Sequence, residues 1–245
     1  MNLVRVDWHI HTTLSPCGSL EMDAETILQK AREMGMDVIG ITDHNSTRQG
    51  RLIKTENPDS RPVILTGAEV TTREEIHCLA FFDDFATLDE FQDYLDRYLP
   101  AIRNNPDYFG DQVVVDRKGR IVYQEDKLLI SALDRSLNEI EGFVRELGGL
   151  FIPAHVNRPH FSLLSQLGFI PEGLLADALE WIPAPGAETG LSEKIQSSGY
   201  PAVYSSDSHN PSQIGRRFTE LELDELTFDG IRRALRNGTV TRCTS

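Results

Sequence analysis

The chain alternates short β-rich runs with amphipathic helical stretches along most of its length. Hydrophobic and β-branched residues predict strands over 3–10 and 36–42, and apolar residues at helical spacing predict a helix over 22–35 between them. The alternation continues to a last predicted helix over 226–238. Because strands joined through helices usually pair in parallel, this pattern predicts an α/β fold built from βα units.

The number of such units narrows the fold further. Further predicted elements are strands over 62–70, 75–82, 149–155, 178–183, 201–206 and 217–223, helices over 85–99 and 132–149, and a hairpin over 113–123. Seven or eight units within 245 residues favour a distorted (β/α)7 TIM-like barrel, with a doubly wound sheet as the alternative. Segment 83–130 breaks the alternation, so we expect it to be an insertion or cap on a single domain over 1–245.

The composition limits the partners of such a domain. The sequence has 24 Lys and Arg against 38 Asp and Glu, a formal charge of −14, which disfavours long nucleic acid. Small phosphorylated substrates stay compatible, because divalent ions reverse the local sign. Three cysteines give no disulfide framework, and neither a signal peptide nor a bilayer-length apolar run is visible. We therefore expect a cytoplasmic protein without a membrane partner, and leave its oligomeric state open.

Histidines and carboxylates fall where the predicted strands end. The residues in question are His9, His11, His44, Glu69, His155, Asp207 and His209, with His77 inside the strand over 75–82. In a parallel barrel the carboxyl ends of the strands converge on one face, so we expect these side chains to meet in one pocket. Imidazoles mixed with carboxylates are typical ligands of Zn, Mn or Fe.

Each of these signals has a plainer explanation when taken alone. Most His-x-His pairs bind nothing, and the pair Asp43–His44 could equally form a turn or a helix cap. His77 in an apolar strand would ordinarily be a hydrogen-bonded core histidine. Glu69 would have to be exposed or paired, because an isolated buried carboxylate is costly. The combination at five strand ends is what favours a metal centre.

The ordered motifs HIHTTLSPCG, ITDHN, GAEV, IHCLAFF, PAHVNR and SSDSH resemble the polymerase-and-histidinol-phosphatase (PHP) superfamily. The resemblance runs from residue 7 to residue 209 and is weakest over 83–130. It implies a distorted seven-stranded (β/α) barrel with two or three divalent metal ions (Zn, Mn or Fe) at the strand ends. It also implies that the chain is an enzyme, a metal-dependent phosphoesterase.

The resemblance implies three sets of metal ligands. They are His9, His11, Glu69 and Asp207 for the first metal; Glu69, His77 and His155 for the second; and His44, His209 and Cys17 for the third. Cys17 departs from the histidine or aspartate of other members. A thiolate can bind Zn or Fe, and the alternative is a small buried cysteine beside a weak, water-completed or empty third site.

Arg158 follows His155 in a segment, AHVNRPH, that resembles the family's phosphate-binding loop. A guanidinium can bind phosphate through two parallel hydrogen bonds, although Arg158 could also be a solvated loop residue. His160 could donate a proton to the leaving oxygen or be an ordinary loop histidine.

The predicted function is metal-dependent hydrolysis of a phosphate ester on a small metabolite or nucleotide. A histidinol-phosphate phosphatase is one alternative, although SPCG stands here where such enzymes often have CPHG. An exonuclease-like phosphodiesterase and a non-catalytic metal-binding domain are the other two.

Overall fold

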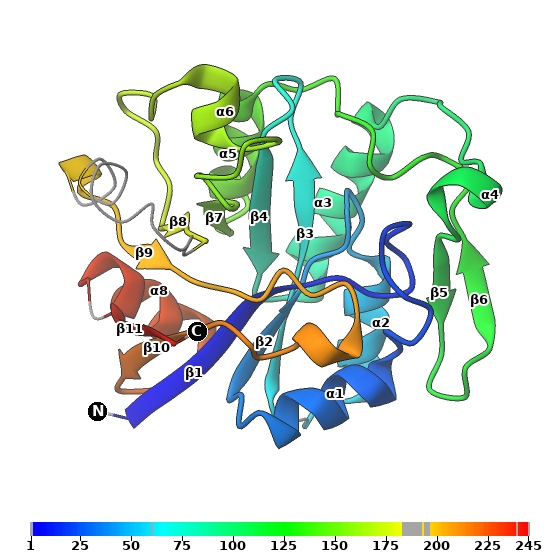
Figure 1. The fold of residues 1–245 in the computed structure, drawn as a ribbon, viewed down its shortest axis with the longest axis horizontal. Coiled ribbons are helices and arrows are strands. Elements are labelled where there is room, and N and C mark those ends of the chain that lie inside the picture. Colours follow the sequence, from blue (N-terminus) through cyan, green and yellow to red (C-terminus); the bar gives the residue numbers. More distant parts are fainter. Residues whose placement is uncertain (1, 60, 183–192, 194–196, 239, 245) are drawn as a thin grey trace.

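The computed structural model describes residues 2–59, 61–182, 193, 197–238 and 240–244 (Figure 1). Its main feature is a seven-stranded sheet in the order β11-β10-β1-β2-β3-β4-β7. The strands of this sheet are β1 (Asn2–Ile10), β2 (Val38–Ile41), β3 (Val63–Thr71), β4 (His77–Phe82), β7 (Leu150–Pro153), β10 (Phe218–Leu223) and β11 (Val240–Thr244). Two small sheets pair β5 (Val113–Val115) with β6 (Ile121–Gln124), and β8 (Leu179–Glu180) with β9 (Ala202–Val203).

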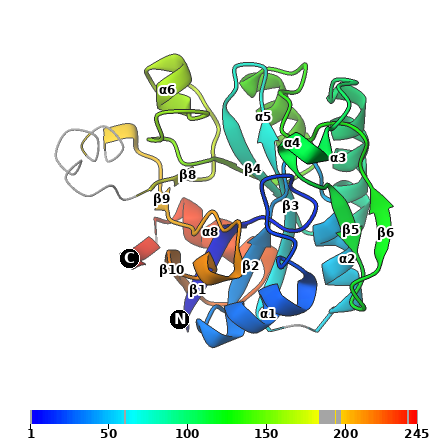
Figure 2. The same ribbon diagram turned by 45° about the vertical axis from the view of Figure 1, so that its right-hand side comes forward.

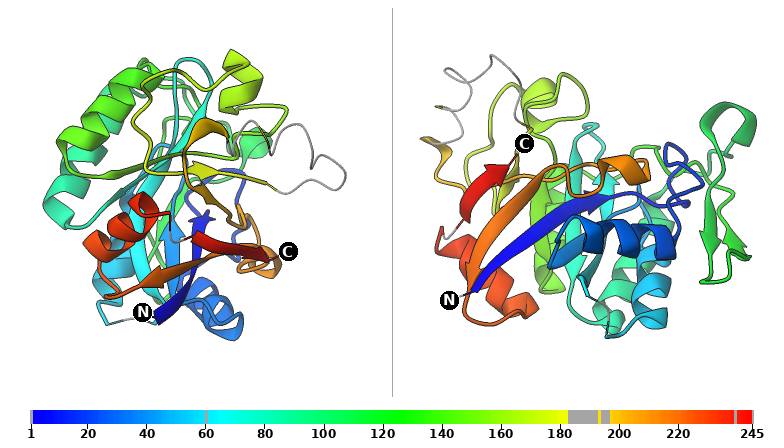
Figure 3. Two further views of the ribbon diagram at one scale, coloured as in Figure 1. Left: turned by 90° about the vertical axis from the view of Figure 1, so that its left-hand side faces the viewer. Right: turned by 60° about the horizontal axis from the view of Figure 1, so that its bottom comes forward.

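Helices surround this curled sheet (Figures 2 and 3). They are α1 (Ala24–Glu33), α2 (Arg48–Glu56), α3 (Phe85–Tyr98), α4 (Pro106–Phe109), α5 (Leu137–Glu146), α6 (Leu163–Leu167), α8 (Phe228–Arg236) and the 3-10 turn η1 (Pro211–Gln213). The helices α2, α3, α5 and α8 contact β3, β4, β7 and β10, respectively. Within the described part of the chain, no helix combines the length and apolar character needed to cross a membrane.

The α/β class is confirmed, but the expectation of parallel strands throughout is wrong. β1, β2 and β3 pair in parallel, whereas β3–β4, β4–β7, β1–β10 and β10–β11 are antiparallel. The connection between β3 and β4, residues 72–76, is too short for a crossover helix, so β4 must return antiparallel. The sheet is therefore curled and of mixed direction, and a complete (β/α)7 barrel remains a prediction. Position 183 of the strand predicted over 178–183 lies outside the described residues.

Local sequence explains the helices that were predicted. Asp23 caps α1 by accepting a hydrogen bond from the Thr26 backbone N–H at 2.9 Å. Ser136 and Glu139 form a capping box at the start of α5. Helix α2 was not predicted, because its sequence RQGRLIKTE carries few apolar residues and buries Gln49 and Gly50 beside Ile53.

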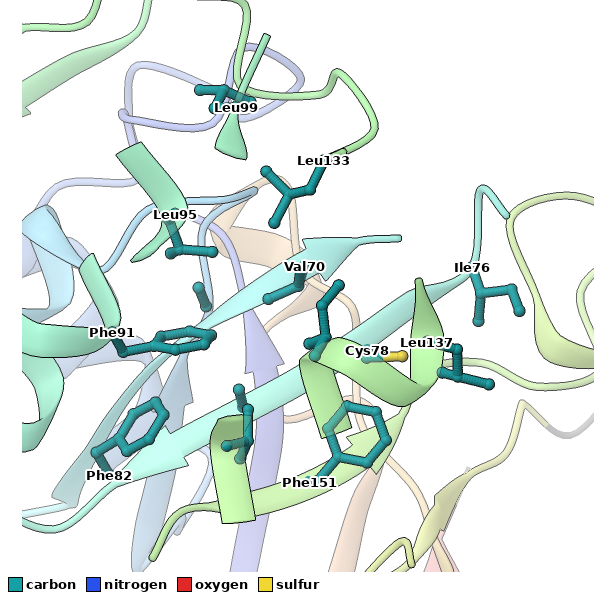
Figure 4. Packing of buried hydrophobic residues seen from close by; sticks show 14 of the residues in the cluster. Val70, Ile76, Cys78, Phe82, Phe91, Leu95, Leu99, Leu133, Leu137 and Phe151 are labelled. Atoms are coloured by element: carbon teal, nitrogen blue, oxygen red, sulfur yellow. The ribbon is translucent and has the colours of Figure 1, made fainter. Parts of the chain in front are cut away.

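The segment 83–130 contains two different parts. Helix α3 belongs to the core, where Phe91 and Leu95 are fully buried against the sheet (Figure 4). Burying side chains of this size contributes about 1.5–3 kcal/mol each. The hairpin β5–β6 instead lies beside the loop that follows β1, because the Val113 N–H donates to the Thr13 carbonyl at 3.1 Å. This second part is the one that fits the predicted cap.

Candidate metal centre

The carboxylate of Glu69 lies at the centre of the predicted site. Ring nitrogens of five histidines lie 2.9–3.4 Å from its oxygens: those of His9, His11, His44, His77 and His155. β3 and β4 pair in a register that sets Thr71 opposite His77, so Glu69 and His77 share one face of the sheet as diagonal neighbours. The strand pairing therefore places Glu69 among imidazoles that are distant in sequence.

The inner part of the centre, which consists of His9, His11, Glu69 and Asp207, contains ligand atoms at the spacing expected around one ion. The Nε2 atoms of His9 and His11 lie 3.1 Å apart, and Asp207 Oδ1 lies 3.4 and 3.3 Å from them. Two ligand atoms that each sit about 2.1 Å from a tetrahedral ion are roughly 3.4 Å apart. His9, His11 and Glu69 of the first predicted set therefore have the spacing of a metal site, and Asp207 lies beside the two histidines.

Two further ring nitrogens fit the role of metal ligands. Nδ1 of His44 and Nδ1 of His77 are buried and lie 3.0 and 2.9 Å from Glu69, yet neither makes a hydrogen bond. Buried polar atoms without partners are rare and costly. A divalent ion between these atoms and the carboxylate would satisfy all of them, so the donor set fits metal.

Hydrogen bonds from outside the centre fix the orientation of its innermost histidines. Nδ1 of His11 lies 2.9 Å from Ser15 Oγ, whose own proton goes to Asp43 Oδ1 at 2.7 Å. The His11 Nδ1–H must therefore be the donor, so Nε2 faces the centre and can bind an ion once its own proton is lost. Asp43, predicted only beside His44, also accepts from the Thr12 N–H and anchors the loop after β1.

Glu180 plays the same part for His9 and was not predicted. It is buried in β8, accepts from His9 Nδ1 at 3.2 Å, and accepts from the His155 backbone N–H at 2.7 Å. Ser205 Oγ also donates to Glu180. The signal in the sequence was a carboxylate inside the apolar run ALEWIP, the same feature that singled out Glu69.

The outer part of the centre is more open. The candidate ligand atoms of His11, Cys17, His44 and His209 all lie within 4.8 Å of one another. Cys17 is exposed, so the alternative in which it fills a gap in the core is wrong. His11 joins the predicted third set here, and ligation by Cys17 stays a prediction.

Burial and charge shift the pKa values of these groups strongly. Burial lowers the pKa of His11, but neighbouring carboxylates outweigh this effect and raise the pKa to about 9. The same two effects oppose each other at His44, whose pKa is also raised to about 9. Burial lowers the pKa of His77 and of His209 to about 4. Burial opposes ionisation of Glu69, yet the imidazoles hold its pKa well below the usual range. Without metal, the centre thus retains several protons.

The centre opens into a cavity of about 230 Å³. Six predicted ligands line it together with Ile130, Arg158 and Phe161. Arg158 Nη1 lies 2.8 Å from Asp207 Oδ2, so this arginine belongs to the site, whereas His160 is exposed and does not line the cavity. A larger cavity of about 730 Å³ near Tyr200 holds no such ligand cluster, so chemistry and not volume identifies the site.

Two ligand positions have unusual backbone conformations. His155 has a φ of 31° and Asp207 a φ of 51°, both in the left-handed region that side chains other than glycine rarely adopt. Such strain costs on the order of 1–3 kcal/mol per residue and concentrates at functional sites.

The chain is similar in sequence to known proteins. A family described as PHP-associated matches residues 194–240. The uncharacterized protein YqxK of Bacillus subtilis is 25% identical over 96% of this chain and 62% of its own length. The chain thus spans less than two thirds of this curated relative.

Solved structures share the fold. The lesion-specific endonuclease Q of Pyrococcus furiosus has a TM-score of 0.72 at 22% identity, over 99% of this chain and 57% of its own. A two-domain protein of Bacteroides vulgatus that contains a predicted PHP-like metal-dependent phosphoesterase has a TM-score of 0.57 at 18% identity, over 98% and 64%. The resemblance to the PHP superfamily is confirmed. An endonuclease Q complex with a 27-mer duplex that carries an abasic lesion at the active site has a TM-score of 0.66 at 22% identity, over 99% and 58%.

Proposed function

We propose that this PHP-type chain is a hydrolase that cleaves phosphate esters with two or three divalent metal ions. The observation that carries the proposal is the set of five imidazoles around the buried carboxylate of Glu69. When bound, such ions activate water and offset the negative charge of a phosphoryl group. Zn, Mn and Fe all suit a donor set of imidazole and carboxylate.

The predicted ligand sets define where the ions would bind. His9, His11, Glu69 and Asp207 would hold the first metal; Glu69, His77 and His155 the second; and His44, His209 and Cys17 the third. Glu180 and Ser15 support the proposal, because they direct the Nε2 lone pairs of His9 and His11 toward the first position. The match to ideal ligand spacing is best for this first set.

Residues of the cavity wall would bind and orient the substrate. Arg158 would bind the phosphate with the guanidinium hydrogens that its contact with Asp207 leaves available, and that contact would orient it. Ile130 and Phe161 would add apolar surface that excludes water from the reacting phosphate.

We favour a small phosphorylated metabolite or nucleotide as substrate. The formal charge of −14 and the small cavity support this choice. The low and odd number of cysteines, which gives no disulfide framework, supports a cytoplasmic location. DNA is the second candidate, because the structural likeness to endonuclease Q covers 99% of this chain. This candidate conflicts with the expectation that the charge disfavours long nucleic acid.

The test compares phosphate release from a panel of phosphomonoesters with cleavage of a labelled duplex that carries an abasic site. The protein is loaded with Mn, Zn or Fe, its metal content is measured, and Glu69→Gln serves as the inactive control. We expect phosphate release by the wild type alone, and histidinol phosphate belongs in the panel. Duplex cleavage would favour the DNA candidate. Stoichiometric metal without any hydrolysis would leave a non-catalytic metal-binding domain.

A further inference from the structure

We infer that Phe161 is a stacking surface for the base of a nucleotide, so that the cavity selects nucleoside phosphates. This inference rests on the proposed phosphoesterase function and names its substrate class. It follows from the position of one aromatic ring at the cavity and from how the chain holds it there.

The ring of Phe161 lies against a predicted metal ligand while remaining accessible. Its centroid lies 5.0 Å from that of His77 with an interplanar angle of 14°, so the two rings are stacked. Phe161 nevertheless stays 44% exposed and lines the cavity. An apolar ring of this size at the edge of a polar centre offers a surface on which a planar group can stack.

The backbone holds the ring in this place. The Phe161 carbonyl accepts a hydrogen bond from the His77 N–H at 3.1 Å, which ties the loop to the first residue of β4. Phe161 has a φ of 53°, a conformation that is unusual for a bulky residue and persists only where surrounding contacts impose it. An exposed phenylalanine that only filled space would not require such a position.

A cation lies on the same turn as the ring. Ser162 Oγ donates to the Arg158 carbonyl at 2.7 Å, which closes the turn from residue 158 to residue 162. Arg158 and Phe161 both line the cavity, so a phosphate-binding group and an aromatic face are held a short distance apart. Ile130, from the segment over 83–130, adds a second apolar side chain to the wall.

This arrangement matches a nucleoside phosphate better than other phosphate esters. A nucleobase gains affinity by stacking its planar face on an exposed aromatic ring, whereas glycerol has no ring to stack. The cavity of about 230 Å³ is smaller than the roughly 300–1,000 Å³ of pockets for drug-sized ligands. It therefore suits the phosphate end of one nucleotide, with the base on the exposed ring of Phe161, and not a longer piece of strand.

The experiment compares two phosphomonoesters, AMP and glycerol 3-phosphate, with wild-type protein and with Phe161→Leu and Phe161→Trp variants. We expect Phe161→Leu to raise the KM for AMP about tenfold, while Phe161→Trp keeps it near the wild-type value. The KM for glycerol 3-phosphate should change much less than the KM for AMP, because this ester has no base to stack on the ring. Phe169→Leu is the matched control, since Phe169 is also an exposed phenylalanine but does not line the cavity.

Binding of AMP to the metal-loaded variants, measured by calorimetry, decides the question independently of turnover. The inference would be overturned if Phe161→Leu weakened the binding of AMP and of glycerol 3-phosphate equally, or if it did not weaken the binding of AMP at all. Hydrolysis of glycerol 3-phosphate by a wild type that shows no preference for AMP would overturn it while leaving the phosphoesterase function intact. AMP binding that needs Phe161 but gives no hydrolysis of either ester would support the inference and count against the phosphoesterase function. Metal content and unfolding temperature confirm that each variant is folded.

Discussion

The inner and outer parts of the metal centre are held in different ways. The side chains of His9 and His11 are fully buried, and their Nδ1 atoms hydrogen-bond to Glu180 and Ser15. Cys17 is exposed, and His209, with a side chain 29% exposed, uses its Nδ1 on the carbonyl of Asp207 in its own loop. We therefore expect the inner part to hold metal tightly and the outer part to exchange it with solvent.

The most disruptive change should be Glu69→Gln, which alters a group shared by both parts. An amide cannot supply the two charged oxygens that five imidazoles surround. Metal affinity and hydrolysis should both fall by more than the roughly 100-fold typical of changes to outer hydrogen-bond partners. Metal analysis after dialysis and initial rates check this. If the variant retained its bound metal and wild-type activity, Glu69 would not be a ligand of the metal centre.

Lowering the pH should have the second-largest effect, because it weakens metal binding. Neutral imidazoles are needed for ligation, while the pKa values of His11 and His44 without metal are about 9. Both are raised, so metal must displace their protons, and metal affinity should rise with pH up to about 9. The slope should approach tenfold per pH unit for each proton released. Chelator competition between about pH 6 and 9 measures it, and a flat profile would contradict the assigned protonation.

Glu180→Gln should weaken the inner part alone. Without its charge, the residue orients His9 less well and no longer raises the basicity of that ligand. We expect a loss of roughly 10–100-fold in affinity for the tightest metal, with the fold preserved. Isothermal titration with Zn measures the loss. Glu172→Gln, at an exposed carboxylate outside the centre, is the matched control and should leave the affinity unchanged.

Cys17→Ser should give the smallest effect and test the outer part. With cobalt bound, thiolate ligation gives a charge-transfer absorption that serine cannot give. We expect the variant to lose this band and the weakest metal while keeping the inner metals, with a fall in activity below about tenfold. In Cys78→Ala the band should persist, because burial raises the pKa of the Cys78 thiol well above its usual value. A wild type without the band would rule out sulfur ligation.

The sequence predicted the gathering of these side chains better than the sheet that carries them, and their role as ligands stays a prediction. Most of these residues follow a run of β-branched or apolar residues, and any fold that gathers strand ends brings them together. His77 instead begins β4 and reaches Glu69 because that strand is antiparallel to β3. Strand direction depends on connection length and tertiary pairing, which the short link over 72–76 decided for β4. Glu180 was missed because ALEWIP lies outside the ordered motifs that guided the prediction, although it carries the same signal of a carboxylate in an apolar run as GAEV.

The left-handed backbone at His155 and Asp207 has a consequence for protein engineering. Glycine adopts such φ values without strain, so replacing either residue by glycine should relieve backbone energy at these positions. Glycine has no side chain with which to bind metal. A screen for thermostable variants that selects for relief of backbone strain alone would therefore replace these two residues early and remove two predicted metal ligands. Stability and activity must for this reason be screened together.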